Sequence, residues 1–313
     1  MLESAELLLA SDPGRGCQIT SLVSRNSGRE WLAQSRGAPR RTQPGDPFDG
    51  EAAYGWDECF PSVAAGTHPS GPWQGRPLAD HGELWSRAWH VEAATPTTLT
   101  ATIEGWRFPY TFQRRLRLRD GTIRADYEVE NRSPADFPAA WSMHPLLRPE
   151  PAMRLALPAA VEMRVESSSR GDLATAGDRF RWPRLGSLDL SNVPADPGRL
   201  ALKLFSAPLT VGRAALVAQD GWLGLSFDTD VASFLGVWLD YEGWPAGAPL
   251  EQLALEPTTG DGDDLGKLAA RGRTMVVPAR GSVAWSVTIQ VGTGPRELEA
   301  FLGSRPAGVT LGG

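Results

Sequence analysis

Apolar and polar side chains alternate with a period of two along much of this chain. In RRLRLRDGTIRADYEVEN, residues 114–131, leucines alternate with arginines before Asp120-Gly121, and Ile, Ala, Tyr and Val occupy alternate positions after it. Such alternation places the apolar side chains on one face of a strand. Asp-Gly favours a two-residue type I′ turn, because both central residues of that turn have positive φ. We therefore predict an antiparallel hairpin centred on Asp120-Gly121.

The same alternation recurs from the start of the chain to its end. The stretch ALVAQDGWLGLSFD, residues 215–228, repeats the hairpin pattern around Asp220-Gly221. A further run, SVAWSVTIQV, residues 282–291, places its apolar side chains on one face. Near the start, CQITSLVSRNSGREWL, residues 17–32, predicts two short strands joined through the Asn, Ser and Gly at 26–28.

Helical patterns are short and rare in this sequence. The best are residues 264–270 and RELEAFLG, residues 296–303, each long enough for about two turns. The 34 glycines and 26 prolines recur at intervals typical of β meanders. We therefore predict an all-β chain of antiparallel strands in stacked sheets, an arrangement that leaves few strand edges exposed.

The composition indicates a globular protein with a large core. The 313 residues are 41% hydrophobic and 22% charged, and large β-sandwiches often exceed about 250 residues as one unit, so we predict one domain over residues 1–313. The net charge of -6 comes from interspersed signs. A nucleic-acid partner would need a concentrated basic face, so a small neutral or weakly charged ligand fits better.

The cysteines and the absence of apolar runs bear on location. Cys17 and Cys59 are too few for a disulfide framework, which indicates reduced, partly buried thiols. The opening MLESAE lacks the basic flank and apolar run of a signal peptide. No stretch approaches the roughly eighteen consecutive apolar residues of a membrane span. We expect a cytoplasmic protein without a membrane partner.

Several common motifs are absent, and each absence removes support for a class. No strand-linked GxGxxG or GxxxxGK[ST] supports nucleotide chemistry, and no HExxH, GxSxG or CxxC indicates a zinc protease, an elbow-type serine hydrolase or a thiol redox enzyme. The GDGDD at residues 260–264 lacks the spaced oxygen ligands of a calcium loop, and we interpret it as a solvated turn before a short helix. We expect no cofactor and no metal.

Three local sequences combine rare residue types with unusual context: DHGELWSRAW at 80–89, WSMHPLL at 141–147 and LEPTTG at 255–260. Because Pro145 follows His144, that histidine is biased to extended backbone, and we place it at a strand end. Glu256 leaves an apolar run and meets a proline, so partial burial is expected to raise its pKa toward neutrality and to make it a competent general base.

Structural roles compete with these chemical ones. A lone histidine in a β-rich chain, such as His81 or His144, is often a hydrogen-bonded structural residue, and Glu256 could equally be an edge-strand charge. We expect His68 and His90 to be structural or surface residues. Most of the 12 tryptophans belong to the core, but flat aromatic faces also pack on pyranose rings. The tryptophans that could form such a platform are Trp85, Trp141 and Trp244.

Taken together and in order, the segments of this chain resemble the aldose 1-epimerase family, the galactose mutarotase-like proteins. The similar segments are GCQITSLVSRNSGREWL, YGWDECFPSV, DHGELW, SMHPLL, LGVWLDYEGWP and LALEPTTG. The resemblance implies an antiparallel β-supersandwich with its site on a concave sheet surface. It also implies an isomerase that interconverts the α and β anomers of a free aldose by ring opening and closure, without a cofactor.

The resemblance also implies roles for single residues. Glu256 corresponds to the base that takes the proton of the anomeric hydroxyl, and His144 to the acid that protonates the ring oxygen. His81 would bind the sugar and stabilise charge on an oxygen. Asp240, in WLDYEGW, is the counterpart that we assign to the sugar-binding aspartate, and Asp57 would reach the substrate or brace a loop. Further substrate contacts are expected from Trp85, Arg87 and Trp244.

The chain departs from the family pattern in two places. Leu146 and Leu147 follow Pro145, where an aromatic pair is usual. Trp85 stands where the hexose-phosphate branch usually has an arginine, and the nearest arginine is Arg87, which weakens a phosphosugar interpretation.

Two alternatives to a free-aldose enzyme remain open. One is an enzyme for a sugar phosphate or uronate, with a cationic pocket formed by residues such as Arg25, Arg87 or Arg148. The other is a carbohydrate-binding protein on the same fold without turnover. In each case the expected partner is a monosaccharide, and the expected state is a monomer or homodimer.

Overall fold

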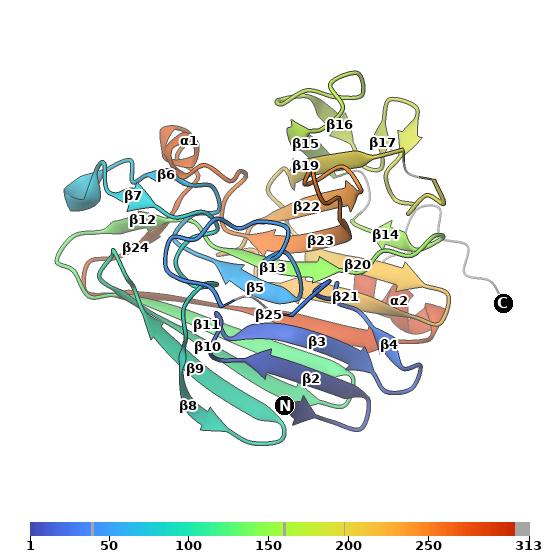
Figure 1. Ribbon diagram of the computed structural model, residues 1–313, viewed down its shortest axis with the longest axis horizontal. Coiled ribbons are helices and arrows are strands. Elements are labelled where there is room, and N and C mark those ends of the chain that lie inside the picture. The colour runs from blue at the N-terminus through green and yellow to red at the C-terminus, as the bar shows by residue number, and fades with distance from the viewer. Residues whose placement is uncertain (39–40, 159–160, 197, 304–313) are drawn as a thin grey trace.

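The computed structural model describes residues 1–38, 41–158, 161–196 and 198–303. Over these residues the chain is nearly all β and forms two large sheets, which confirms the predicted antiparallel fold class (Figure 1). The larger sheet has eleven strands, in the order β1 (Leu2–Glu3), β2 (Leu7–Asp12), β3 (Gln18–Ser24), β5 (Trp56–Cys59), β13 (Ser142–Leu147), β23 (Glu251–Thr258), β22 (Phe234–Tyr241), β19 (Leu200–Ser206), β15 (Glu162–Ser168) and β16 (Arg179–Arg181), with β4 (Arg29–Glu30) paired to β3.

The second sheet has eight strands within the described ranges. Their order is β14 (Arg154–Ala156), β20 (Gly212–Ala218), β21 (Gly221–Phe227), β25 (Ser282–Gly292), β11 (Thr122–Asn131), β10 (Tyr110–Arg119), β9 (Thr98–Glu104) and β8 (His90–Ala94). Three small pairs complete the β structure: β12 (Phe137–Ala139) with β24 (Met275–Val277), β17 (Arg184–Leu185) with β18 (Leu188–Asp189), and β6 (Gly66–Thr67) with β7 (Pro77–Leu78).

Local patterns in the sequence fix most of these elements. The hairpin β10–β11 turns through Asp120 and Gly121, and Asp120 has φ 50°. In the second hairpin, however, Ala218 pairs with Gly221, so the turn is Gln219-Asp220, one residue earlier than the predicted Asp220-Gly221. The predicted strand 282–291 is β25. Two short helices, α1 (Leu265–Ala270) and α2 (Pro295–Leu302), and a 3₁₀ turn, η1 (Gly71–Trp73), are the helical elements of the described part.

The core lies between the inner faces of the two sheets. Along β11 the side chains alternate between buried and more exposed positions, and one hydrophobic cluster joins residues of the larger sheet, such as Leu9 and Ile19, to Phe112 and Val129 of the second. Burial of this size is the main favourable term in folding. The opposite face of the larger sheet is therefore available for a site. None of the helices in the described segments is long and apolar enough to cross a bilayer.

Candidate active site

A cavity of about 280 Å³ opens over the middle strands of the larger sheet. Its floor comes from β13, β23, β22 and β19, and loops supply its walls. A volume near the lower end of the usual range of ligand sites suits a small molecule. The side chains that line it are Phe48, Val63, Asp80, His81, His144, Leu146, Ser167, Lys203, Trp238, Trp244, Gln252 and Asp263.

The strand register brings the expected acid and base together. The antiparallel pairing of β13 with β23 places His144 level with Glu256. His144 also pairs with Asp57 on β5, and Glu256 pairs with Gly236 on β22. Paired residues of antiparallel strands project from the same face of a sheet, so these side chains share the face that carries the cavity. His144 lies inside β13 and not at a strand end as predicted, although its backbone is extended as expected.

His144 is held in an orientation and a charge state that suit an acid. Its ring is buried, and Nδ1 lies 3.1 Å from Oδ1 of Asp57. Burial alone would lower the pKa of His144, but the hydrogen bond and the charge of Asp57 outweigh it and raise that pKa above its ordinary value. The imidazolium form is therefore favoured, and Asp57 acts through His144.

Glu256 differs from the expectation in the direction of its pKa. Its carboxylate is buried, and Oε2 accepts hydrogen bonds from the Lys203 ammonium and, at 3.4 Å, from Ser142 Oγ. Burial favours the neutral acid, but the charges of Lys203 and His144 outweigh burial and hold the pKa of Glu256 below its usual value. The predicted rise toward neutrality is therefore wrong, because the neighbours of Glu256 along its own strand do not reveal a cation two strands away.

Lys203 and Asp263 are the other charged residues at the floor of the cavity. Burial would lower the pKa of Lys203, but Glu256 and Asp263 raise it, so the ammonium form is favoured. The Asp263 Oδ1 atom lies 4.0 Å from Lys203 Nζ. That oxygen and Oε1 of Glu256 have no hydrogen-bond partner among the described residues. Because buried polar atoms are normally paired, these two oxygens are candidates to accept hydrogen bonds from a bound molecule.

Gly236 leaves the space that the Glu256 carboxylate occupies. A Cβ atom added at Gly236 would lie 2.9 Å from Oε2 of Glu256 and 3.4 Å from the ring of Phe205. Any larger residue on this position of β22 would displace the carboxylate. The glycine thus sets where the base lies relative to His144.

His81 stands over the cavity on a strained loop position. Its φ is 56°, and the following Gly82 packs so closely on Phe60 that a Cβ atom there would lie 2.1 Å from the Phe60 carbonyl oxygen. The His81 ring stacks on Phe48 with centroids 3.9 Å apart, and its Nδ1 lies 2.9 Å from Oδ1 of Asp80. The His-Gly dipeptide therefore fixes the ring above the sheet.

Asp240 lies behind the cavity wall. Its Oδ1 accepts hydrogen bonds from the backbone N–H groups of Gly243, at 3.0 Å, and Trp244, at 2.9 Å, and so holds the Trp244 turn in place. Burial raises the pKa of Asp240 to about 7, and its Oδ2 has no partner in the described part of the chain. Trp244 itself lines the cavity together with Trp238, with ring centroids 6.4 Å apart.

Six predicted residues are absent from the lining of this cavity. Glu256, Asp57 and Asp240 are buried next to residues that line it, and the other three are placed as follows. Trp85 is buried behind Phe48, and its indole N–H donates to the Asp80 carbonyl at 2.9 Å. Arg87 lines a different surface pocket, and its guanidinium donates to the carbonyl of Glu104. Trp141 lies in the core, where its indole N–H donates to Oε2 of Glu58 at 2.9 Å.

The remaining charged candidates are also accounted for. Glu58, the neighbour of Asp57 on β5, projects to the core face, where it accepts hydrogen bonds from Arg114 and Tyr127, whereas Asp57 shares the face of the sheet that carries the cavity. Arg25 forms an exposed ion pair with Glu3. Arg25, Arg87 and Arg148, from which a sugar phosphate or uronate site would need a cationic pocket, are all missing from the lining of this cavity.

Sequence reasoning missed several of the lining residues. Lys203 carried a usable signal, since it is the one charged residue in the buried strand LALKLFS. Asp263 belongs to the segment predicted to be a solvated turn, but it lines the cavity. Phe48 and Trp238 carried no signal that separates them from core residues.

Comparison with known proteins agrees with this architecture. The sequence model of the aldose 1-epimerase family matches residues 2–170, more than half of the chain. This chain belongs to the aldose 1-epimerase family. The matched part of the aldose 1-epimerase domain contains Asp57, His81 and His144, whereas Glu256 and Lys203 lie beyond it. No curated protein matches the sequence.

Solved structures share the fold over nearly the whole chain. A galactose mutarotase related enzyme from Lactobacillus acidophilus has a TM-score of 0.69 and 14% identity over 93% of this chain and 96% of its own. Galactose mutarotase-like proteins from Lactobacillus casei (TM-score 0.68, 17% identity, 93% of this chain and 99% of its own) and Clostridium acetobutylicum (0.68, 14%, 93% and 94%) are similar. At these identities the likeness establishes the fold.

Proposed function

We propose that this protein is a mutarotase that interconverts the α and β anomers of a free aldose. The observation that carries the proposal is the register of β13 and β23, which holds His144, a lining residue of the cavity, level with the buried Glu256 on the same face of the sheet. Their environments favour opposite charge states, an imidazolium and a carboxylate. One group can therefore supply a proton while the other accepts one, as ring opening requires.

In this mechanism both proton transfers take place in the cavity. The Glu256 carboxylate takes the proton of the anomeric hydroxyl, and the His144 imidazolium gives its proton to the ring oxygen. The bond between the anomeric carbon and the ring oxygen breaks, which leaves an open-chain aldehyde. After rotation about the bond between the first two carbons, the reverse transfers close the ring on the other face and restore both residues. Each positioned group of this kind contributes about 10²–10⁴ in rate.

Lys203 adjusts the base for this task. By lowering the pKa of Glu256 it keeps the carboxylate ionised, and it occupies Oε2 while Oε1 has no partner among the described residues. Oε1 is therefore the oxygen that we assign to the anomeric hydroxyl. Lys203 positions and tunes Glu256, and it does not exchange protons with the sugar.

The rest of the cavity binds and orients the ring. Trp244 offers an aromatic face for the apolar C–H surface of a pyranose, and His81, braced by Asp80, donates or accepts a hydrogen bond at a sugar oxygen. Asp57 acts by orienting His144, and Asp240 acts by holding Trp244. Trp85 supports this wall from behind, and Arg87 has no part in the proposal because it lines another pocket.

A neutral sugar fits this cavity better than an anionic one. Lys203 is the single Lys or Arg among the lining side chains of the described segments, and it is already paired with Glu256. Asp80 and Asp263 add negative charge. A phosphate or a uronate carboxylate would meet these carboxylates without a free cation to offset them, so we favour a free aldose over a sugar phosphate or uronate.

The cysteines support a reducing location. Cys17 and Cys59 are both buried and unpaired, as is usual in proteins of a reducing compartment. We therefore place the reaction in the cytoplasm.

Polarimetry of freshly dissolved α-anomers tests the proposal. We expect the wild type to speed the approach to equilibrium for at least one aldose in a panel. Glu256→Gln should abolish that acceleration while sugar binding remains, and Glu251→Gln, at the exposed start of the same strand, should match the wild type. Equal rates with and without protein for every sugar, together with measurable binding, would instead favour a carbohydrate-binding protein.

A further inference from the structure

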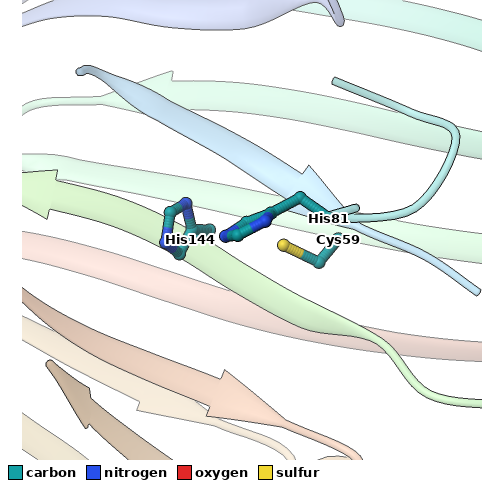
Figure 2. A group of neighbouring side chains, drawn as sticks. All are labelled: Cys59, His81 and His144. Atoms are coloured by element: carbon teal, nitrogen blue, oxygen red, sulfur yellow. The ribbon is translucent and has the colours of Figure 1, made fainter. Parts of the chain in front are cut away.

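A cysteine and two histidines from distant parts of the sequence converge beside the cavity. One ring nitrogen each of His81 and His144 and the sulfur of Cys59 all lie within 4.8 Å of one another. Figure 2 shows the Cys59 sulfur and the His81 ring directed toward His144. The residues come from the end of β5, from the loop after β7 and from β13.

The two histidines are oriented as metal-binding histidines are. In each ring Nδ1 lies against a carboxylate oxygen: Asp80 for His81, at 2.9 Å, and Asp57 for His144, at 3.1 Å. Such a contact fixes the ring and leaves Nε2 as the nitrogen open to a ligand. Histidines that bind a metal almost always carry this second partner.

The three donor atoms suit one class of ion. A thiolate and two imidazoles are typical ligands of Zn²⁺, with bonds of about 2.3 Å to sulfur and 2.0–2.1 Å to nitrogen. Donors at those distances stand about 3.5 Å apart in a tetrahedron, so atoms up to 4.8 Å apart must move closer when the ion binds. The His81 side chain is 20% exposed and the His144 side chain 7%, so ion binding requires mainly the His81 ring to shift from its stacked position on Phe48.

We propose that Cys59, His81 and His144 bind a Zn²⁺ ion that stops the sugar chemistry reversibly. The fourth tetrahedral position faces the cavity, where water completes the site. On binding, the Cys59 thiol and the His144 imidazolium each release a proton to solvent, and the sulfur and the freed nitrogen bond to the ion. The ion takes the nitrogen of His144 that would protonate the ring oxygen, so the loaded protein cannot open a sugar ring. The binding site is independent of the proposed function, and the inhibition rests on it.

Cobalt(II) binding tests the site without any sugar. Chelator-treated wild type titrated with Co²⁺ should give a thiolate-to-cobalt charge-transfer band that saturates at one ion per chain, and added Zn²⁺ should remove the band. Cys59→Ser should lose the band, and Cys17→Ser should keep it. Cys17 is the matched control because it is also buried, and its sulfur lies 3.6 Å from Ser11 Oγ. Absence of the band in wild type, or its persistence in Cys59→Ser, would overturn the proposal.

Two further readouts keep the outcomes separate. If Cys59→Ser is poorly folded, Cys59→Ala is used, and the rise in melting temperature with Zn²⁺ seen in wild type should vanish in that variant and remain in Cys17→Ser. In the anomer assay Zn²⁺ should inhibit wild type, and the concentration for half inhibition should rise at least about tenfold in Cys59→Ser.

The binding and the activity can fail separately. A cobalt band in a protein without anomerase activity would uphold the site and contradict the proposed function. Anomerase activity without a cobalt band would uphold the proposed function and contradict the metal site. Activity with equal Zn²⁺ inhibition in wild type and Cys59→Ser would have the same meaning.

Discussion

Removing the charge of Lys203 gives a direct test of how the base is tuned. In Lys203→Met the cation against Glu256 is lost, while the burial that opposes ionisation remains. An opposite charge at this range typically shifts a carboxyl pKa by about 1–3 pH units, so the pKa of Glu256 should rise by that amount. With a higher pKa, Glu256 stays protonated, and therefore inactive as a base, up to a higher pH. The acid limb of the kcat/KM profile should therefore move upward by about 1–3 pH units.

The assay is anomer exchange measured by NMR or polarimetry between pH 4 and pH 9, roughly the span over which histidine and carboxyl groups titrate. Lys267→Met is the matched control, because Lys267 is the other lysine of the chain and its side chain is exposed on α1. Its profile should overlay the wild type. An acid limb that stays in place in Lys203→Met, in a protein that still binds sugar, would refute the account of the ion pair.

The same change has a consequence for stability. In the wild type the pKa of Glu256 is below its unfolded value, so its ionisation stabilises the fold above the unfolded pKa of about 4.3, and that contribution is lost as pH falls through the folded pKa. In Lys203→Met the buried carboxylate is unpaired, which costs about 3–5 kcal/mol near neutral pH. Denaturant melts should show this loss shrink as pH falls and Glu256 becomes protonated.

Three further substitutions probe the neighbouring groups. Gly236→Ala places a methyl group 2.9 Å from Oε2 of Glu256. Because the carboxylate is displaced, kcat in steady-state assays should fall about 10- to 100-fold. An unchanged kcat would contradict the role of the glycine. Asp57→Asn removes the charge that raises the pKa of His144, so the alkaline limb of the pH profile should shift to lower pH, and a fixed limb would show that Asp57 does not tune the acid. Trp244→Ala should raise KM about 2- to 10-fold in the same assay with little change in kcat, and an unaltered KM would remove Trp244 from the sugar contact.

Much of the fold follows from local patterns. The period-two alternation around Asp120-Gly121 gave the hairpin β10–β11 in the expected register. Asp-Gly at 220–221 predicts the second turn one residue too late, because Gly221 already pairs with Ala218. Pro145 predicts a strand end at His144, but Pro145 itself pairs with Trp56 inside β13, so the strand continues past it.

The site depended on information that one strand does not carry. Glu256 and His144 could be singled out from their own neighbours, but the direction of the Glu256 pKa depends on Lys203, which is brought close only by the strand order β23, β22, β19. The convergence of Cys59 with His81 and His144 has the same origin, because no spacing within one segment relates the three residues. Pairing between strands that are distant in the sequence determines both the direction of the Glu256 pKa and the convergence of these three side chains.

In the proposed mechanism His144 and Glu256 act as one unit on a hemiacetal. A double-mutant cycle on anomer exchange measures it most directly, with His144→Gln, Glu256→Gln and the double variant compared at matched sugar occupancy. Substitutions of residues that act in one chemical step have strongly non-additive effects on rate. The double variant should therefore be no slower than the slower single variant. Rate losses that multiply, or full activity in either single variant, would contradict it.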